Sequence, residues 1–308
     1  MALWAFASTG FEGVIAIVRH LGVGGFLIFC LYSLGVFVLL GAAWLTASPG
    51  EPAARLGLFS WGRLIRESVS DLLPFAQIGG IIVATQTLAA HGVPRARVYA
   101  SMIADMTTEL ASQLVFTIFG LAIMASMLLG AGATSLRPLV FGGTIAMFMI
   151  VALFLVGQRW ILRVGARLAA RIVPATAGGM RDVDAELGRI YTRRSRIAGA
   201  FVLNLAAWQA SATGAWIVLH LVGNGLSFLS VMSLESLIFT LRSVAFFVPG
   251  ALGVQEAAYA LAAPLFGLPA EAALALSLAK RARDVALGLP SLLVWQMSEM
   301  RAIFRRPD

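Results

Sequence analysis

Charge, cysteine, histidine and lysine are all scarce in this sequence. Only 12% of its 308 residues are charged, whereas soluble domains average about 25%, and 59% are hydrophobic, which excludes an ordinary soluble fold. The single cysteine, Cys30, excludes an internal disulfide and a cysteine-based metal site, and three scattered histidines offer no other set of ligands. We therefore expect an all-α, polytopic integral membrane protein without a metal or another cofactor.

Basic residues outnumber acidic ones, and nearly all of them are arginine. Lysine and arginine total 23 against 15 acidic residues, which gives a formal net charge of +8, and only Lys280 is a lysine. An arginine excess can indicate nucleic-acid binding, but in a membrane protein it more often marks cytoplasmic loops. We therefore expect no nucleic acid among the partners.

Several segments are long enough to cross a bilayer, which takes about 20 predominantly apolar residues. Three of them, 22–47, 139–157 and 197–222, contain no charged residue. Two more, 98–129 and 270–298, are equally long but carry charges within them. These five segments are the predicted spans.

Two further apolar segments, 59–91 and 228–266, are interrupted by a proline with glycines close behind it. Proline disrupts a helix, and a broken helix is tolerated at membrane depth only where protein or a watery cavity covers the freed backbone. The pattern therefore predicts two re-entrant helices. Each is broken at a proline and a glycine, namely Pro74 with Gly79 and Pro249 with Gly253.

Clusters of arginine predict which loops face the cytoplasm. Residues 158–196 hold nine arginines and three acidic residues. Smaller basic groups are Arg55, Arg63 and Arg66, then Arg95 and Arg97, then Arg301, Arg305 and Arg306. By the positive-inside rule all four regions are cytoplasmic, which puts the N-terminus outside and the C-terminus in the cytoplasm.

The chain also matches itself when it is shifted by 175 residues. The matching pairs include Pro74 with Pro249, Gly92 with Gly267, and Pro94 with Pro269. The same shift moves span 22–47 onto 197–222. We interpret this pattern as an internal repeat within a single transmembrane domain, residues 1–308.

Loop orientation predicts opposite topology for the two repeats. Repeat one covers about 22–130 and repeat two about 197–298, with the linking span 139–157 and the cytoplasmic basic loop 158–196 between them. Inverted repeats with broken helices that meet near the midplane are the architecture of secondary transporters. The sequence therefore favours a transport protein.

Charged residues lie inside the predicted membrane segments. Each costs about 2.5–3.5 kcal/mol at a helix centre, so together they must face one another or a hydrated cavity. We take seven of them as candidate substrate-binding residues: Arg281, Lys280, Arg242, Glu256, Asp105, Glu109 and Asp284.

These charges have two interpretations. They form ion pairs that lock the repeats together, or they bind a zwitterionic or anionic group such as a lipid phosphate, for which arginine is the better fork. The repeat sets Asp105 against Lys280 and Glu109 against Asp284. We expect Asp105 or Glu109 to be the acidic partner of Arg281.

Two motifs, one in each half, carry a family resemblance. The second-half motif is residues 247–256, FVPGALGVQE, continued by GLP at 267–269, KRARD at 280–284 and GLP at 288–290. Its first-half counterpart is residues 73–80, LPFAQIGG, followed by GVP at 92–94. With these motifs the chain resembles the transmembrane, flippase-like domain of the lysylphosphatidylglycerol synthase family, and within it the hopanoid-biosynthesis-associated branch.

The resemblance implies lipid translocation between the leaflets of the bacterial inner membrane, with membrane lipids, among them a hopanoid, as partners. It does not imply aminoacylation, so we expect no enzyme. Two alternatives stay open. One is an ion-coupled small-solute transporter on the same scaffold, and the other is an intramembrane lipid-modifying enzyme with a carboxylate as general base.

Overall fold

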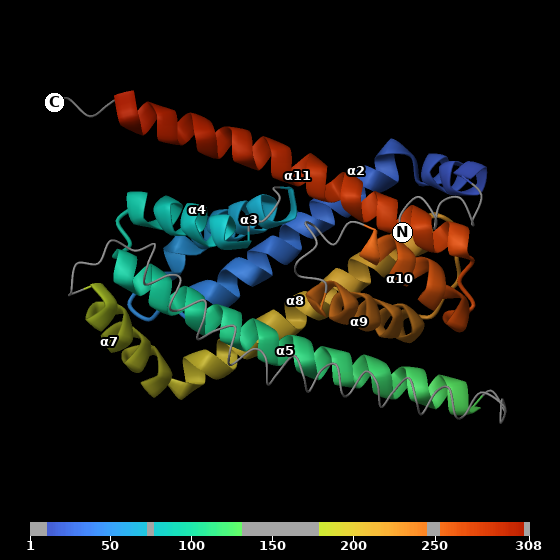
Figure 1. The fold of residues 1–308 in the computed structure, drawn as a ribbon, viewed down its shortest axis with the longest axis horizontal. Helices are drawn as coiled ribbons and strands as arrows, with labels where there is room; N and C mark the ends of the chain where they lie inside the picture. Colours follow the sequence, from blue (N-terminus) through green and yellow to red (C-terminus); the bar gives the residue numbers. More distant parts are fainter. Residues whose placement is uncertain (1–10, 73–76, 131–178, 245–252, 305–308) are drawn as a thin grey trace.

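The computed structural model describes residues 11–72, 77–130, 179–244 and 253–304 (Figure 1). Within these ranges the chain forms helices joined by short turns and contains no β-strand, which confirms the predicted all-α fold. The predicted span 139–157 lies outside the described residues. So do Pro74 and Pro249, the two prolines at which helix breaks are predicted.

The helices follow one another in the same order in both halves of the chain. The first half comprises α2 (Phe11–Thr46), η1 (Ala53–Arg55), α3 (Leu56–Leu72), α4 (Gln77–Ala90) and α5 (Arg95–Gly130). After α7 (Gly179–Thr192), the second half comprises α8 (Arg194–Leu221), α9 (Phe228–Val244), α10 (Val254–Ala262), η4 (Ala263–Phe266) and α11 (Ala270–Phe304).

Three of the described helices are long and apolar enough to cross a membrane. They are Arg19–Thr46 in α2, Arg95–Ser126 in α5 and Arg194–Leu221 in α8, in agreement with the predicted spans 22–47, 98–129 and 197–222. Helix α11 contains the predicted span 270–298 and is equally long, although it carries charges and Pro290.

Both segments that were predicted to be broken consist of two helices. Helix α3 is separate from α4, and α9 is separate from α10. Gly253 has φ 79° and precedes the first turn of α10, as expected of a glycine at a break. The prediction for Gly79 was wrong, because this residue lies inside α4. Its neighbour Gly80 lets α4 pack closely on α3, since a Cβ there would lie 2.5 Å from the Arg66 carbonyl oxygen.

The turns that lead into α5 and α11 have the same hydrogen bonds. In each, a glycine in the left-handed region, Gly92 (φ 82°) or Gly267 (φ 74°), follows the preceding helix. In the first turn, the backbone N–H groups of Gly92 and Val93 donate to the carbonyl oxygens of Ala89 and Leu88, respectively. In the second turn, the N–H groups of Gly267 and Leu268 donate to the carbonyl oxygens of Pro264 and Ala263. This is the glycine-dependent helix end of a Schellman motif, and it recurs where the sequence repeat places it.

Helices α2 and α8 lie side by side through the centre of the molecule (Figure 1). Gly214 of α8 makes this approach possible, because Phe29 and Tyr32 of α2 fill the space beside it, and the Tyr32 hydroxyl donates to the Ala210 carbonyl over 3.0 Å. Helix α5 packs on α8 and α9, and α11 packs on α2 and α3. These contacts correspond to one another under the repeat.

Candidate functional site

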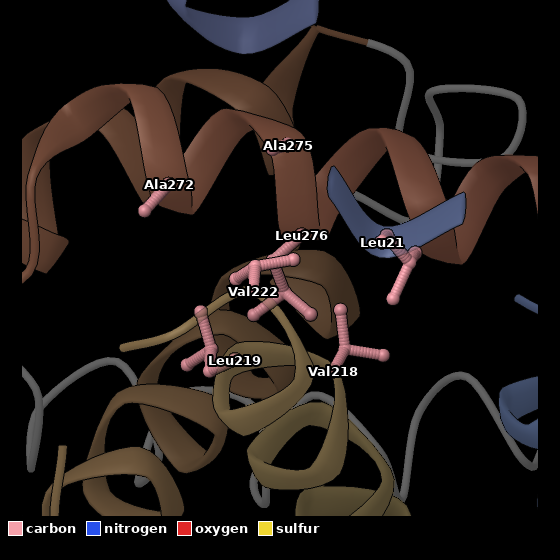
Figure 2. A pocket seen from close by; sticks show the side chains of 7 residues that line it. All are labelled: Leu21, Val218, Leu219, Val222, Ala272, Ala275 and Leu276. Atoms are coloured by element: carbon pink, nitrogen blue, oxygen red, sulfur yellow. The ribbon is translucent and has the colours of Figure 1, made fainter. Parts of the chain in front are cut away.

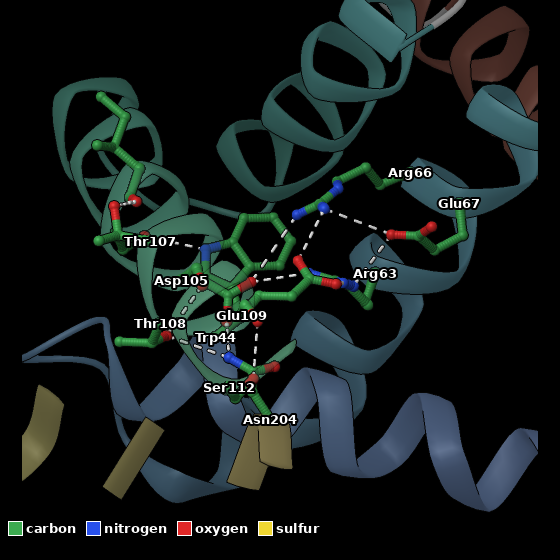
Figure 3. Close-up of polar contacts among 12 residues, drawn as sticks. Trp44, Arg63, Arg66, Glu67, Asp105, Thr107, Thr108, Glu109, Ser112 and Asn204 are labelled. Carbon is green, nitrogen blue, oxygen red and sulfur yellow. Dashed lines mark hydrogen bonds and ion pairs between the residues drawn. The ribbon is translucent and has the colours of Figure 1, made fainter. Parts of the chain in front are cut away.

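Arg63 lies at the centre of a buried charged cluster that joins α3 to α5 (Figure 3). Its Nη1 donates to Asp105 Oδ2 over 2.8 Å, and its Nη2 donates to Glu109. Arg66 reaches Glu109 Oε2 over 3.2 Å. Only 1% of the Arg63 side chain and 0% of the Asp105 side chain are exposed, so these charges are stable only as a paired set.

Asn204 connects this cluster to the second half of the chain. From α8, its Nδ2 donates to Asp105 Oδ1 over 3.2 Å and to Thr108 Oγ1 over 3.1 Å (Figure 3). Trp208, one turn further along α8, donates its ring N–H to the Glu109 carbonyl over 3.4 Å. The first cluster therefore ties α3, α5 and α8 together.

The sequence analysis placed Arg63 and Arg66 in a cytoplasmic loop, and the structure contradicts this. Both are buried within α3, because the carboxylates of α5 receive their guanidinium groups. A spacing signal was present in the sequence, since Arg63, Arg66 and Glu67 recur at intervals of three and four residues, as the neighbours on one face of a helix do.

A second buried cluster lies between α9, α10 and α11. Tyr259 donates its hydroxyl to one oxygen of Glu235, and Lys280 donates to the other. Lys280 Nζ also lies 2.8 Å from the Tyr259 hydroxyl oxygen and 5.0 Å from the centre of the Phe239 ring. Sequence reasoning found Lys280 but did not select Glu235 or Tyr259 as site residues.

Arg281 pairs with Glu256, which corrects the expected pairing with Asp105 or Glu109. The Arg281 Nε lies 3.3 Å from Glu256 Oε1. Glu256 Oε2 accepts a 2.8 Å hydrogen bond from the Gly253 N–H, so the same side chain caps the start of α10. The expected pairing failed because Asp105 and Glu109 are already occupied by Arg63.

A third group of charges is partly exposed and connects the two halves. Arg242 Nη2 at the end of α9 lies 3.3 Å from Asp71 Oδ1 at the end of α3, with 22% and 25% of these side chains exposed. On α11, Arg283 Nε lies 3.0 Å from Asp284 Oδ1. Glu67 lies one turn before Asp71 on α3, where it also pairs with Arg63 Nε over 3.3 Å, and α11, which carries Arg283 and Asp284, packs on α3. We call Arg242, Asp71, Glu67, Arg283 and Asp284 the central charged patch.

The first two clusters have opposite polarity. In the first half, α3 supplies the bases and α5 the acids, whereas in the second half α9 supplies Glu235 and α11 supplies Lys280. Helices α3 and α9 occupy equivalent places in the repeat, as do α5 and α11. The repeated scaffold therefore carries charges of exchanged sign.

These charges do not form a metal site in the described ranges, and the pocket shown in Figure 2 has an apolar lining. No group of three or more His, Cys, Asp or Glu residues there is arranged to hold a metal. Figure 2 shows a small apolar pocket between α2, α8 and α11, lined by Leu21, Val218, Leu219, Val222, Ala272, Ala275 and Leu276. This lining carries no polar side chain that could bind a headgroup.

Comparison with protein families places most of the chain within one family model. The family model described as lysylphosphatidylglycerol synthase TM region covers residues 1–290. No curated protein and no solved structure matches the chain.

Proposed function

The chain belongs to the family of the lysylphosphatidylglycerol synthase TM region, and from this premise we propose that it moves a phosphate-bearing lipid between the leaflets of the bacterial inner membrane. The headgroup passes through the central charged patch while the acyl chains stay in the bilayer. We propose transport rather than catalysis, with no cofactor.

The observation that carries this proposal is the partial exposure of the central charged patch. Charges that only lock helices together are best fully buried and fully paired, as Arg63 and Asp105 are. The Arg242–Asp71 pair instead keeps about a quarter of its surface open where α3 and α9 end. An open arginine–carboxylate pair can exchange its partner for a phosphate, which guanidinium groups bind in the same forked geometry.

Each member of the patch has a role in the proposal. Arg242 and Arg283 bind the phosphate, and Glu67 and Asp71 bind a cationic part of the headgroup. Since the patch contains three acids and two bases, it favours a headgroup that carries a positive charge as well as the phosphate. Arg281 extends the phosphate path, because its Nη2 has no hydrogen-bond partner among the described residues.

The remaining candidates have supporting roles. Asp105, Glu109 and Lys280 lie in the two buried clusters, so we assign them to holding the helices that frame the patch. Glu256 orients Arg281, and Asp284 orients Arg283.

We further propose that the two halves are inverted repeats, with the N-terminus outside and the C-terminus in the cytoplasm. The common order of helices, the matching turns at Gly92 and Gly267 and the corresponding packing partners support this arrangement. If the chain belongs to the hopanoid-associated branch, the proposal requires a hopanoid with a charged headgroup. A neutral polycyclic lipid has no charge with which the central charged patch could interact.

Reconstitution tests the proposal. Purified protein in liposomes is given fluorescent phosphatidylethanolamine, phosphatidylglycerol or an uncharged diacylglycerol, and movement to the outer leaflet is followed by dithionite quenching. We expect movement of the phosphate-bearing lipids and little acceleration of the uncharged one.

A charge-neutral double variant assigns the activity to the patch. Arg242→Gln with Asp71→Asn removes both charges without leaving one unpaired, and we expect lipid movement to fall about tenfold or more, as for loss of a charge-assisted phosphate contact. Arg189→Gln is the matched control, since Arg189 pairs with Glu186 on the surface, 74% exposed. Wild-type rates in the double variant would overturn the assignment.

A further inference from the structure

Lys280 is the only lysine in the chain, and it lies in one of its most buried places. The other 22 basic residues are all arginine. Only 3% of the Lys280 side chain is exposed, and its partner Glu235 is fully buried. All other basic residues of the chain are arginine. The one lysine therefore lies in a buried site, where lysine and arginine differ in their chemistry.

That difference is the ability to release a proton. A guanidinium stays charged in proteins, whereas an amine in a buried site can exist in either form. The first-half cluster is built on Arg63 and Arg66 and therefore holds a permanent positive charge. The second-half cluster is built on Lys280, beside Glu235 and Tyr259, so its positive charge can be released as a proton.

The groups around Lys280 balance the two forms of its amine. Glu235 and the Tyr259 hydroxyl oxygen accept hydrogen bonds from it and favour the ammonium form. Arg283 follows Lys280 by about one turn of α11, and Arg242 follows Glu235 by about two turns of α9, so both bring positive charge toward the amine and oppose that form. From the other helices packed on α11, Asp71 of α3 pairs with Arg242, Glu256 of α10 pairs with Arg281, and α2 carries the buried Cys30.

We propose that Lys280, held by Glu235 and Tyr259, is a proton-binding site that is loaded together with the lipid phosphate. On loading, the Lys280 amine takes one proton from water to become an ammonium, and the charge of the three-residue cluster rises from −1 to 0. On unloading, the same proton returns to water. No other covalent bond changes.

The link to lipid rests on the proposed function. Arg242 and Arg283 belong to the central charged patch, and their places one turn from Lys280 on α11 and two turns from Glu235 on α9 also make them repel a charge on Lys280. A phosphate bound to them neutralises that repulsion and strengthens proton binding at Lys280. By linkage, a bound proton strengthens phosphate binding by the same factor. The lipid and the proton therefore travel in the same direction.

The single lysine allows a direct measurement on the wild-type protein. Protein labelled with [¹³Cε]lysine in nonionic detergent has one lysine signal, whose shift reports amine or ammonium. It is followed from about pH 5 to about pH 11, the range over which lysines in proteins titrate. We expect one reversible transition, whose midpoint rises by about one pH unit, a tenfold coupling, when phosphatidylethanolamine is added. This lipid has no net charge, so surface potential does not move the midpoint.

Arg242→Gln is the matched control. Loss of the repelling charge raises the midpoint before lipid is added, and the further rise with lipid shrinks. A Lys280 signal that stays at the ammonium position throughout, with and without lipid, would overturn the proposal. A transition that ignores phosphatidylethanolamine in the wild-type protein would overturn the joint loading.

Transport assays separate the failure of this inference from the failure of the proposed function. In liposomes we expect wild-type lipid movement to respond at least about fivefold to an imposed pH gradient, and Lys280→Arg to reduce that ratio to about one. Lipid movement that is indifferent to the gradient overturns the proton coupling and leaves transport standing. Absence of lipid movement at any gradient overturns transport, while the titration still decides the proton site.

Discussion

A guanidinium inside a membrane protein is stable only while its carboxylates remain beside it. Arg63 satisfies Asp105 and Glu109 at once, and Asn204 occupies the remaining Asp105 oxygen. We therefore regard Arg63 as the residue on which the first cluster depends. Its loss leaves the buried Asp105 without its closest basic partner, while Glu109 retains only Arg66.

Replacement of Arg63 by alanine should destabilise the protein by about 3–5 kcal/mol, the usual cost of leaving a buried charge unpaired. Thermal unfolding in detergent, followed by tryptophan fluorescence, measures the effect. Arg63→Met combined with Asp105→Asn should recover most of the loss, because Glu109 then keeps Arg66 as its partner. If Arg63→Ala is as stable as the exposed control Arg189→Ala, the cluster is not structural.

The sequence revealed some of these residues and concealed others for a physical reason. Asp105, Glu109 and Lys280 stand out because they interrupt long apolar stretches, where a charge is costly. Arg63 lies close in sequence to Arg66, Glu67 and Asp71, so a charge there does not stand out, and its burial depends on partners far along the chain. Which acid meets which base is decided by packing between helices, and a single sequence does not contain that information.

At the scale of elements, α5 of the first half and α9 of the second half approach each other closely at a glycine. A Cβ at Gly120 of α5 would lie 1.9 Å from the Ser236 Oγ and 2.5 Å from its Cβ. The Thr117 and Thr240 hydroxyl groups meet nearby at 3.0 Å. The approach therefore depends on the absence of a side chain at position 120.

Gly120→Ala should force α5 and α9 apart and destabilise the protein by about 1–3 kcal/mol, as overpacking usually does. Gly35→Ala is the matched control, since nothing lies within 4 Å of a Cβ in the middle of α2 and alanine favours a helix by up to about 1 kcal/mol. Unfolding temperatures of the two variants measure the difference. Equal stabilities would show that α5 and α9 do not meet at this contact.

Helix breaks were predictable from local chemistry, whereas the fit of one helix on another was not. Proline disfavours a helix whatever surrounds it, so the sequence predicts breaks at Pro74 and Pro249, which lie outside the described residues, and the described residues hold one helix on each side of both positions. Gly79 and Gly80 were read as part of a break because glycine also disfavours helices. Both glycines instead lie inside α4, where the absence of a side chain at Gly80 lets α4 pack closely on α3.

At the scale of the whole molecule, the repeat was visible in sequence because a turn needs particular residues. Gly92 and Gly267 adopt positive φ, and the prolines that follow them help to start α5 and α11. The similarity of the two halves is less visible at the charged positions, because matched residues such as Asp105 and Lys280 carry opposite charges. The direction of each half relative to the membrane is a separate property, set by the flanking charges.

Cysteine labelling tests that direction. After Cys30→Ala, a single cysteine is placed at Arg95, the first residue of α5, or at Gly225, between α8 and α9, both exposed positions. If the repeats are inverted with a cytoplasmic C-terminus, a membrane-impermeant maleimide added to intact cells should label position 225 at once and position 95 only after permeabilisation. The physical reason is the cluster of arginines around position 95, which is held in the cytoplasm. Labelling of both positions from the same side would show that the two halves share one orientation, and the proposed inverted repeats would then be wrong.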